Sequence, residues 1–153
     1  MDIGSIFPLT KQEVQITTEN YPFFDGNVYR FSLCREALLV IAQREKSDRC
    51  KVLIPSYTCD TVITPFLETK WECSYYPINK DLSINVNKTK RIIDSEKINL
   101  LIVHPYFGMD LSEQELDLLS YAKQKGCKIV IDLTQCIFSN QQVEVADYYV
   151  GSY

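Results

Sequence analysis

The chain has 153 residues, of which 46% are hydrophobic, so it can build the core of one domain. Sixteen basic and twenty acidic side chains give a net charge of −4 without a long run of either sign. This balance argues against nucleic-acid and membrane-surface partners, which select basic patches. No apolar run approaches the roughly 18 residues of a membrane span, and the N-terminus lacks the pattern of a signal peptide. We therefore expect a cytoplasmic protein.

The sulfur and imidazole side chains do not have the spacing of a metal site. The chain contains six cysteines and one histidine, His104, and no C-x-x-C pair occurs. Structural zinc sites need such ligands at short spacing, so we expect no metal and reduced, mostly buried thiols. The cysteines are Cys34, Cys50, Cys59, Cys73, Cys127 and Cys136.

The first elements after the N-terminal segment alternate between strand and helix patterns. Residues 28–32 (VYRFS) alternate apolar and polar side chains, which predicts a short strand. Residues 33–46 place Leu38, Leu39 and Ala42 on one face, as an amphipathic helix does. Residues 51–56 form an apolar run typical of a buried strand.

The middle of the chain continues this alternation. Residues 60–70 have a helical pattern that conflicts with Pro65 unless the helix is kinked there. Residues 71–78 are rich in aromatic side chains and predict a strand, and residues 85–94 predict a short surface helix. Residues 98–104 (INLLIVH) predict a fully buried strand.

The last third has the clearest helix signals. Ser112 and Glu115 have the spacing of a capping box, and Gly126 suits the end of the helix that they begin. Residues 128–133 (KIVIDL) predict another strand, and residues 147–153 (DYYVGSY) begin one more. Strands without alternation, separated by helices, predict an α/β fold of three layers, with a mainly parallel sheet and helices on both faces.

The chain stops at VGSY, in or just after a strand, with no helix to cover it. Small α/β domains usually finish with a covering helix. We therefore expect residues 1–153 to be the first part of a larger domain rather than a short domain that ends on a strand.

Ligands of open parallel sheets bind outside the carboxyl ends of the strands. The chain has a polar residue or a helix breaker after each predicted strand, which a packed interior would not need. The candidate positions are residues 32–36, 56–59, 104–108, 132–135 and 151–152.

Asp132 is the most informative of these residues because it ends the apolar strand of KIVIDLTQ. A half-buried carboxylate must be paired, or its pKa rises. A cationic nitrogen of a ligand is one possible partner, and local backbone N–H groups are the other. Gln135, three residues later, would lie on the same side if the chain turns there, where its amide can donate to a ligand oxygen.

Two strand-to-helix junctions are candidate anion sites, since helix N-termini bind anions through free N–H groups. At the first, Arg35 would add a positive charge suited to phosphate; alternatively, Ser32 is an ordinary N-cap and Arg35 a surface charge. Thr58 and Cys59 occupy the second junction, with the same alternatives. His104 is either a catalytic or a structural histidine.

Six segments together resemble the fold-type-I pyridoxal-phosphate enzymes, most closely the DegT/DnrJ/EryC1/StrS aminotransferases. The resemblance covers roughly residues 31–153 and rests on the order and spacing of the segments. They are CREALL, VLIPSYTCDTVITPF, YYPINKDLSI, LIVHPYFGMD, KIVIDLTQ and DYYVGSY.

The resemblance implies that pyridoxal 5′-phosphate is the cofactor, and it implies a role for each matching residue. Asp132 corresponds to the aspartate that pairs with the protonated ring nitrogen, and Gln135 to the residue that contacts the phenolic oxygen. The turn that holds the phosphate corresponds to Cys34, Arg35 and Glu36. The family usually has Gly-Thr there, so this sequence departs from it, and Arg35 is a candidate to replace the lost hydroxyl contact.

The remaining matches concern the ring face and the end of the chain. Thr58 and Cys59 correspond to the segment beside the ring; an aromatic residue often stacks where Cys59 stands, and Tyr57 is a candidate substitute. Ser152 corresponds to the serine of an S-x-x-K motif that contributes to phosphate binding. The lysine of that motif, which binds the cofactor covalently, would fall two positions beyond Tyr153. The resemblance therefore implies no catalytic residue in this chain.

We expect an incomplete N-terminal portion of the large domain of such a transferase, inactive alone. The complete protein would move an amino group from an amino-acid donor to a keto acceptor, such as a sugar, as a homodimer or with a second chain that completes it. One alternative is a non-catalytic remnant or interaction protein that retains the scaffold. A flavodoxin-like or receiver-like domain is a weaker alternative, because the acidic cluster and late lysine that it requires are not evident.

Overall fold

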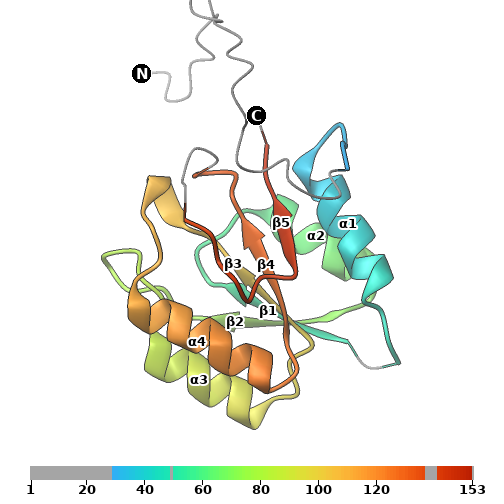
Figure 1. Cartoon of the computed structure of the whole chain (residues 1–153). Helices are drawn as coiled ribbons and strands as arrows, with labels where there is room; N and C mark the ends of the chain where they lie inside the picture. Colours follow the sequence, from blue (N-terminus) through green and yellow to red (C-terminus); the bar gives the residue numbers. More distant parts are fainter. Residues whose placement is uncertain (1–28, 49, 137–140, 153) are drawn as a thin grey trace, which may run out of the picture.

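The apolar runs of the sequence form one parallel sheet, which the computed structural model describes within residues 29–48, 50–136 and 141–152 (Figure 1). The strands are β1 (Lys51–Pro55), β2 (Glu72–Tyr76), β3 (Leu100–Val103), β4 (Lys128–Asp132) and β5 (Tyr148–Val150). Their order is β2-β1-β3-β4-β5, and every pairing between these strands is parallel. The predicted α/β fold with a mainly parallel sheet is thus confirmed.

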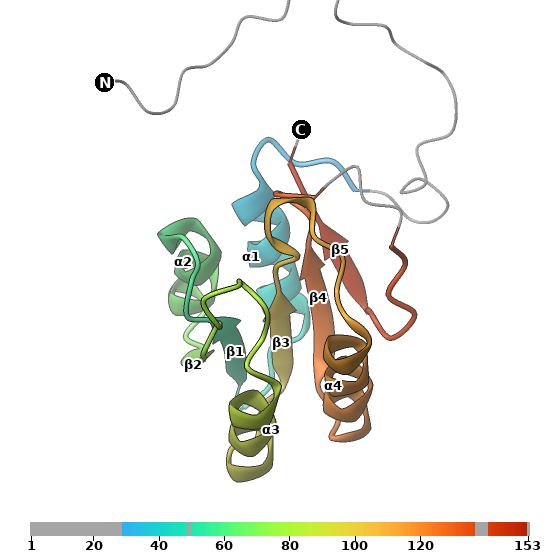
Figure 2. The ribbon, with the colours of Figure 1, turned by 90° about the vertical axis from the view of Figure 1, so that its left-hand side faces the viewer.

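Helices cover both faces of this sheet. They are α1 (Cys34–Arg44), α2 (Asp60–Glu68), α3 (Val86–Ser95) and α4 (Glu113–Gln124), with a short 3₁₀ helix, η1 (Tyr106–Gly108). The two helices of each pair, α1 with α2 and α3 with α4, contact each other, and Figures 1 and 2 show the α3–α4 pair apart from the α1–α2 pair. Parallel connections need such crossover segments, and here they form the two outer layers.

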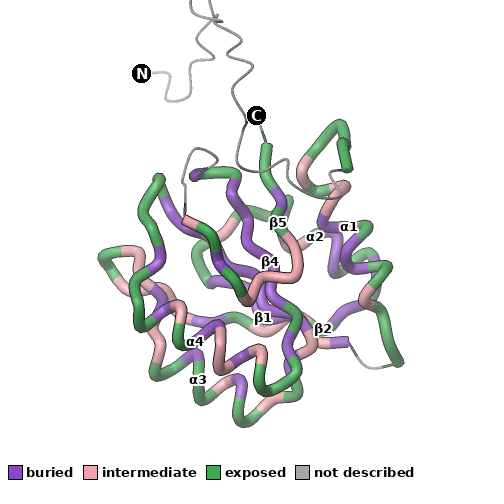
Figure 3. The backbone as a smooth tube through the Cα atoms, viewed as in Figure 1, coloured by how far each residue is buried: buried purple, intermediate pink, exposed green. Residues whose placement is uncertain are grey.

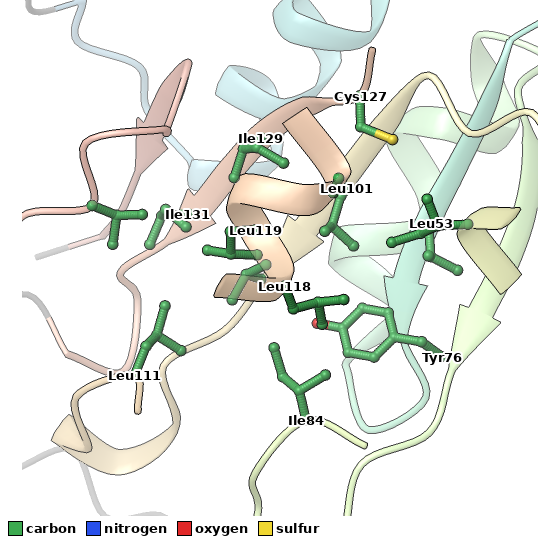
Figure 4. Close-up of a cluster of buried hydrophobic side chains, with 14 of the residues drawn as sticks. Leu53, Tyr76, Ile84, Leu101, Leu111, Leu118, Leu119, Cys127, Ile129 and Ile131 are labelled. Atoms are coloured by element: carbon green, nitrogen blue, oxygen red, sulfur yellow. The ribbon is translucent and has the colours of Figure 1, made fainter. Parts of the chain in front are cut away.

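Alternate side chains of β1, β3 and β4 supply two separate cores. Leu101, Ile129 and Ile131 pack with Leu119 of α4 on one face (Figure 4). Val52, Leu100 and Val130 are among the strand residues of the other core, which includes side chains of α1 and α2. β3 is buried along its whole length, and β1 and β4 are buried except at their first residues (Figure 3). The outer strands β2 and β5 are largely intermediate or exposed. Burial on both faces explains why β1, β3 and β4 show no apolar–polar alternation.

The structure confirms the predicted ends of α4. The Ser112 hydroxyl accepts the backbone N–H of Glu115, and the Glu115 carboxylate accepts the backbone N–H of Ser112 at 2.8 Å. Gly126 follows the helix with a φ of 88°, in the left-handed region that favours glycine. Glu115 also accepts the backbone N–H of Ile84 at 2.8 Å, so one buried carboxylate links α4 to the segment before α3.

The structure corrects three details near the first two helices. Residues 29–32 form no strand, since no neighbouring strand pairs with them, and Val28 lies outside the described residues. The N-cap of α1 is Leu33 rather than Ser32, with the first helical turn held by Glu36. Helix α2 continues through Pro65. Among the described residues, no helix is both long and apolar enough to cross a membrane.

Candidate functional site

A cleft of about 320 Å³ opens at the carboxyl ends of β1, β3 and β4. β2 and β3 are the two neighbours of β1, one on each side of it, so the strand order reverses direction at β1. Ligands of doubly wound sheets bind at such a reversal. The predicted site residues that line the cleft are Cys34, Arg35, Thr58, Cys59, Asp132 and Gln135. Glu36 and Ser152 are not part of its lining.

Asp132 is the last residue of β4, and its side chain is 4% exposed. Its Oδ1 accepts the backbone N–H of Thr134 at 3.0 Å and the Thr134 hydroxyl at 2.6 Å. Its Oδ2 lies 3.4 Å from Nδ1 of His104. The sequence allowed either local groups or a ligand nitrogen as the partner of Asp132, and local hydrogen bonds from Thr134 are present. These bonds do not occupy every acceptor position of the carboxylate. An ionised carboxyl group has about four lone-pair positions, which leaves capacity for a cationic donor from the cleft.

His104 connects Asp132 to Thr58. Its Nε2 lies 2.9 Å from the Thr58 hydroxyl, and its ring packs edge-on against Tyr106 with centroids 5.8 Å apart. Burial lowers the pKa of His104 from its ordinary value, although the negative charge of Asp132 opposes this shift. Where the neutral imidazole carries its proton at Nδ1, the nitrogen on the side of Asp132, Nε2 is left to accept from the Thr58 hydroxyl. The sequence patterns did not predict this connection among three residues, although all three lie at or just after the carboxyl ends of neighbouring strands.

Gln135 is held at the cleft by the loop after β3. Its Oε1 accepts the backbone N–H of Phe107 at 3.3 Å, which leaves the amide NH₂ group as a donor. Phe107 has a φ of 50°, in the left-handed region, and its side chain is 66% exposed. This contact could not be predicted from the sequence, because Phe is rare in the left-handed conformation that it requires.

The N-terminus of α1 supplies one wall of the cleft. The Thr134 hydroxyl lies 3.7 Å from the Cys34 thiol, and burial together with the charge of Asp132 raises the pKa of that thiol. Arg35 lines the cleft and is exposed. The Glu36 carboxylate instead accepts the backbone N–H groups of Ser32 and Leu33, at 3.0 and 3.3 Å. Glu36 thus closes the start of the helix rather than facing the cleft.

The segment between β1 and α2 forms another wall. Cys59 is the N-cap of α2, and its thiol lies 2.7 Å from the hydroxyl of Thr61. Tyr57 also lines the cleft and is 55% exposed, with its ring centroid 5.6 Å from that of Tyr106. An aromatic side chain therefore lies beside Cys59, where the sequence suggested Tyr57 as a substitute.

Ser152 lies outside the cleft but at the same edge of the sheet. Val150 pairs with Asp132 in the parallel ladder, and Ser152 follows it two residues later as an exposed residue. Its predicted role in phosphate binding stays a prediction. In the described part of the chain, no lysine lines the cleft and no group of three His, Cys, Asp or Glu side chains could hold a metal ion.

The sequence matches no family profile and no curated protein, but the fold matches solved structures. A pyridoxal-phosphate-bound C-S lyase from Staphylococcus hominis aligns with a TM-score of 0.57 at 18% identity, over 68% of this chain and 31% of the lyase. A complex of SepCysS with the SepCysE N-terminal domain aligns with a TM-score of 0.65 at 17% identity, over 78% and 35%. Tyrosine aminotransferase from Leishmania infantum aligns with a TM-score of 0.59 at 15% identity, over 78% and 36%.

At these identities the matches establish only that this chain shares its α/β fold with these proteins. The chain spans about a third of the length of these proteins. The narrower resemblance to the DegT/DnrJ/EryC1/StrS aminotransferases stays a prediction.

Proposed function

We propose that the cleft holds the ring of pyridoxal 5′-phosphate, within the N-terminal part of the large domain of an aminotransferase. The observation that supports this most is the position of Asp132. It is a buried carboxylate fixed through one oxygen by Thr134, at the carboxyl edge of a sheet whose fold is shared with a pyridoxal-phosphate-bound lyase. When bound, the cofactor would supply an electron sink for the bonds at the carbon that carries the amino group of a substrate.

The residues present fit the ring end of this cofactor. Asp132 offers a negative charge to a protonated ring nitrogen, in a place where water does not compete. The free amide NH₂ of Gln135 is suited to a phenolic oxygen. Tyr57 and Cys59 lie on the wall where the resemblance places the ring face.

The fit at the phosphate end is partial. At the start of α1 the Glu36 N–H donates to the Leu33 carbonyl at 3.0 Å, so the N–H groups of Cys34 and Arg35 are the ones proposed to face an anion, and the Arg35 side chain adds a positive charge. The negative charge of Glu36 at the same helix start opposes an anion there. In our proposal Arg35 and the backbone of Cys34 hold the phosphate, with Ser152 as a further contact.

The complete site needs groups that the described cleft does not hold. We propose that the lysine that binds the cofactor covalently comes from outside the described residues, in a larger domain or a homodimer. An amino-acid donor and a keto acceptor, such as a sugar, are the proposed substrates. The lack of a lysine in the described lining also supports the second candidate, a scaffold that binds the cofactor without turning it over.

The strand order β2-β1-β3-β4-β5 is also that of flavodoxin-like domains. Such domains normally place a helix in each parallel crossover. Here the described residues between β4 and β5 contain no helix, and α1, which precedes β1, contacts β5 instead. This arrangement favours the transferase fold over the flavodoxin-like alternative.

A calorimetric titration of the chain with pyridoxal 5′-phosphate tests the proposal. We expect saturable binding that Asp132→Asn weakens by about tenfold or more, the effect of losing one charge-assisted hydrogen bond. Asp117→Asn, at an exposed position of α4, is the matched control and should bind as the wild type does. Equal affinity in both variants would contradict the proposed role of Asp132.

A further inference from the structure

Three side chains in the cleft form a hydroxyl–imidazole–carboxylate series. The Thr58 hydroxyl lies 2.9 Å from Nε2 of His104, and Nδ1 of the same ring lies 3.4 Å from Oδ2 of Asp132. Thr58 and His104 follow β1 and β3, Asp132 is the last residue of β4, and all three line the same cleft. This is the order of groups that activates a hydroxyl nucleophile in acyl transfer on several unrelated folds.

We propose that Thr58 is a nucleophile toward small carboxylic esters or thioesters, with His104 as its general base and Asp132 as the group that orients His104. This activity goes beyond the proposed aminotransferase function and needs no cofactor.

Each group is held in the state that the proposal requires. Thr134 fixes Oδ1 of Asp132 through two hydrogen bonds, so Oδ2 stays turned toward the imidazole. The side chain of His104 is only 9% exposed, and burial lowers its pKa. A neutral ring with its proton at Nδ1, the nitrogen 3.4 Å from Asp132, can accept a proton only at Nε2, where the Thr58 hydroxyl lies.

The surroundings of Thr58 suit an acyl group. Thr58 lies in the turn between β1 and α2, and the N-cap of α2 is the next residue, Cys59. Backbone N–H groups in the first turn of a helix lack intrahelical partners and can stabilise the negative oxygen of a tetrahedral intermediate. Leu38 and Val62 give the cleft an apolar wall for a short acyl chain.

The reaction balances without an oxidant or metal. Oγ1 of Thr58 bonds to the carbonyl carbon while its proton moves to Nε2 of His104. The bond from that carbon to the leaving oxygen or sulfur then breaks, and His104 gives its proton to the leaving group. A water molecule then gives a proton to Nε2 of His104 while its oxygen bonds to the acyl carbon. The bond from that carbon to Oγ1 of Thr58 breaks, His104 returns the proton to Oγ1, and the carboxylic acid leaves.

Hydrolysis of p-nitrophenyl acetate by the full chain tests this proposal. The cleft thiols can also attack esters, so the assay uses a background with Cys34→Ala and Cys59→Ala. We expect p-nitrophenol release above the buffer rate. Thr58→Val and His104→Gln should each lower kcat/KM by about 100-fold or more, whereas Thr58→Ser should retain activity. His104 is the only histidine of the chain, so no other imidazole can account for the reaction.

Thr64→Val is the matched control, because the Thr64 hydroxyl lies on the exposed side of α2 and donates to the Asp60 carbonyl at 2.8 Å. Thermal unfolding verifies that each variant is folded, and mass spectrometry of the quenched reaction should locate an acetyl group on Thr58. The proposal is overturned if the background chain releases no product above buffer, if Thr58→Val retains the rate, or if the acetyl group is found only on other residues.

Discussion

His104 and Asp132 are neighbours across the carboxyl ends of β3 and β4, with Nδ1 and Oδ2 3.4 Å apart. Their proximity follows from the strand register, because Val103 pairs with Ile131 in the parallel ladder and these are the preceding residues. Both side chains are more than nine-tenths buried. A shift of one residue in this register would turn one of the two side chains to the opposite face of the sheet.

The stability of the protein should depend on pH through His104. Burial lowers its pKa in the folded chain, so between that value and the ordinary 6.5 the unfolded chain binds more protons. The stabilising contribution is complete above about pH 6.5 and is lost as the pH falls through the folded pKa. The groups that face the imidazole are Asp132, Thr58 and Tyr106.

Urea unfolding of the wild type and His104→Gln at a series of pH values measures this dependence. The stability of the wild type should fall more steeply than that of the variant below about pH 6.5. Parallel curves for the two proteins would show that the folded state does not lower the pKa of His104.

Thr134→Val should weaken cofactor binding without direct contact with the ring. The substitution removes the hydroxyl that donates to Oδ1 of Asp132 at 2.6 Å, so the carboxylate is less firmly oriented. We expect a loss of about 1 kcal/mol, or roughly fivefold in the dissociation constant for pyridoxal 5′-phosphate, by calorimetry. Thr134→Ser, which retains the hydroxyl, should restore the affinity, and failure to do so would assign the effect to packing.

Glu115→Ala should be strongly destabilising because it removes one carboxylate with several partners. Glu115 accepts the backbone N–H groups of Ile84 and Ser112, each at 2.8 Å, and is 6% exposed. Leaving the buried N–H of Ile84 and the part-buried N–H of Ser112 unpaired costs about 2–4 kcal/mol in the free energy of unfolding. Glu113→Ala, in the same helical turn but exposed, should change it by less than about 0.5 kcal/mol. Similar losses in the two variants would contradict this role.

The sequence predicted the sheet and the cleft better than the contacts inside the cleft. Strands such as 128–132 follow from apolar runs, and the capping box at Ser112 follows from local chemistry, so short segments determine both. The strand expected at residues 28–32 has no partner strand among the described residues. A local sequence pattern does not show whether a partner strand is present. Most of the predicted cleft residues came together because parallel strands bring their carboxyl ends to one edge.

The contacts within the cleft depend on strand register and loop conformation. The link from Asp132 through His104 to Thr58 requires three strands in a particular register. The Glu36 side chain could either cap the start of α1 or line the cleft, and in the structure it caps the helix. A pattern along one sequence does not determine such choices.

The most direct test of the central claim is the ¹⁵N NMR shift of pyridoxal 5′-phosphate labelled at its ring nitrogen and bound to the chain at about pH 8. We predict the shift of a protonated ring nitrogen in the wild type and in Asp117→Asn, and of an unprotonated one in Asp132→Asn. An unprotonated nitrogen in the bound wild-type complex, or the same protonated shift in Asp132→Asn, would contradict the pairing of this carboxylate with the ring.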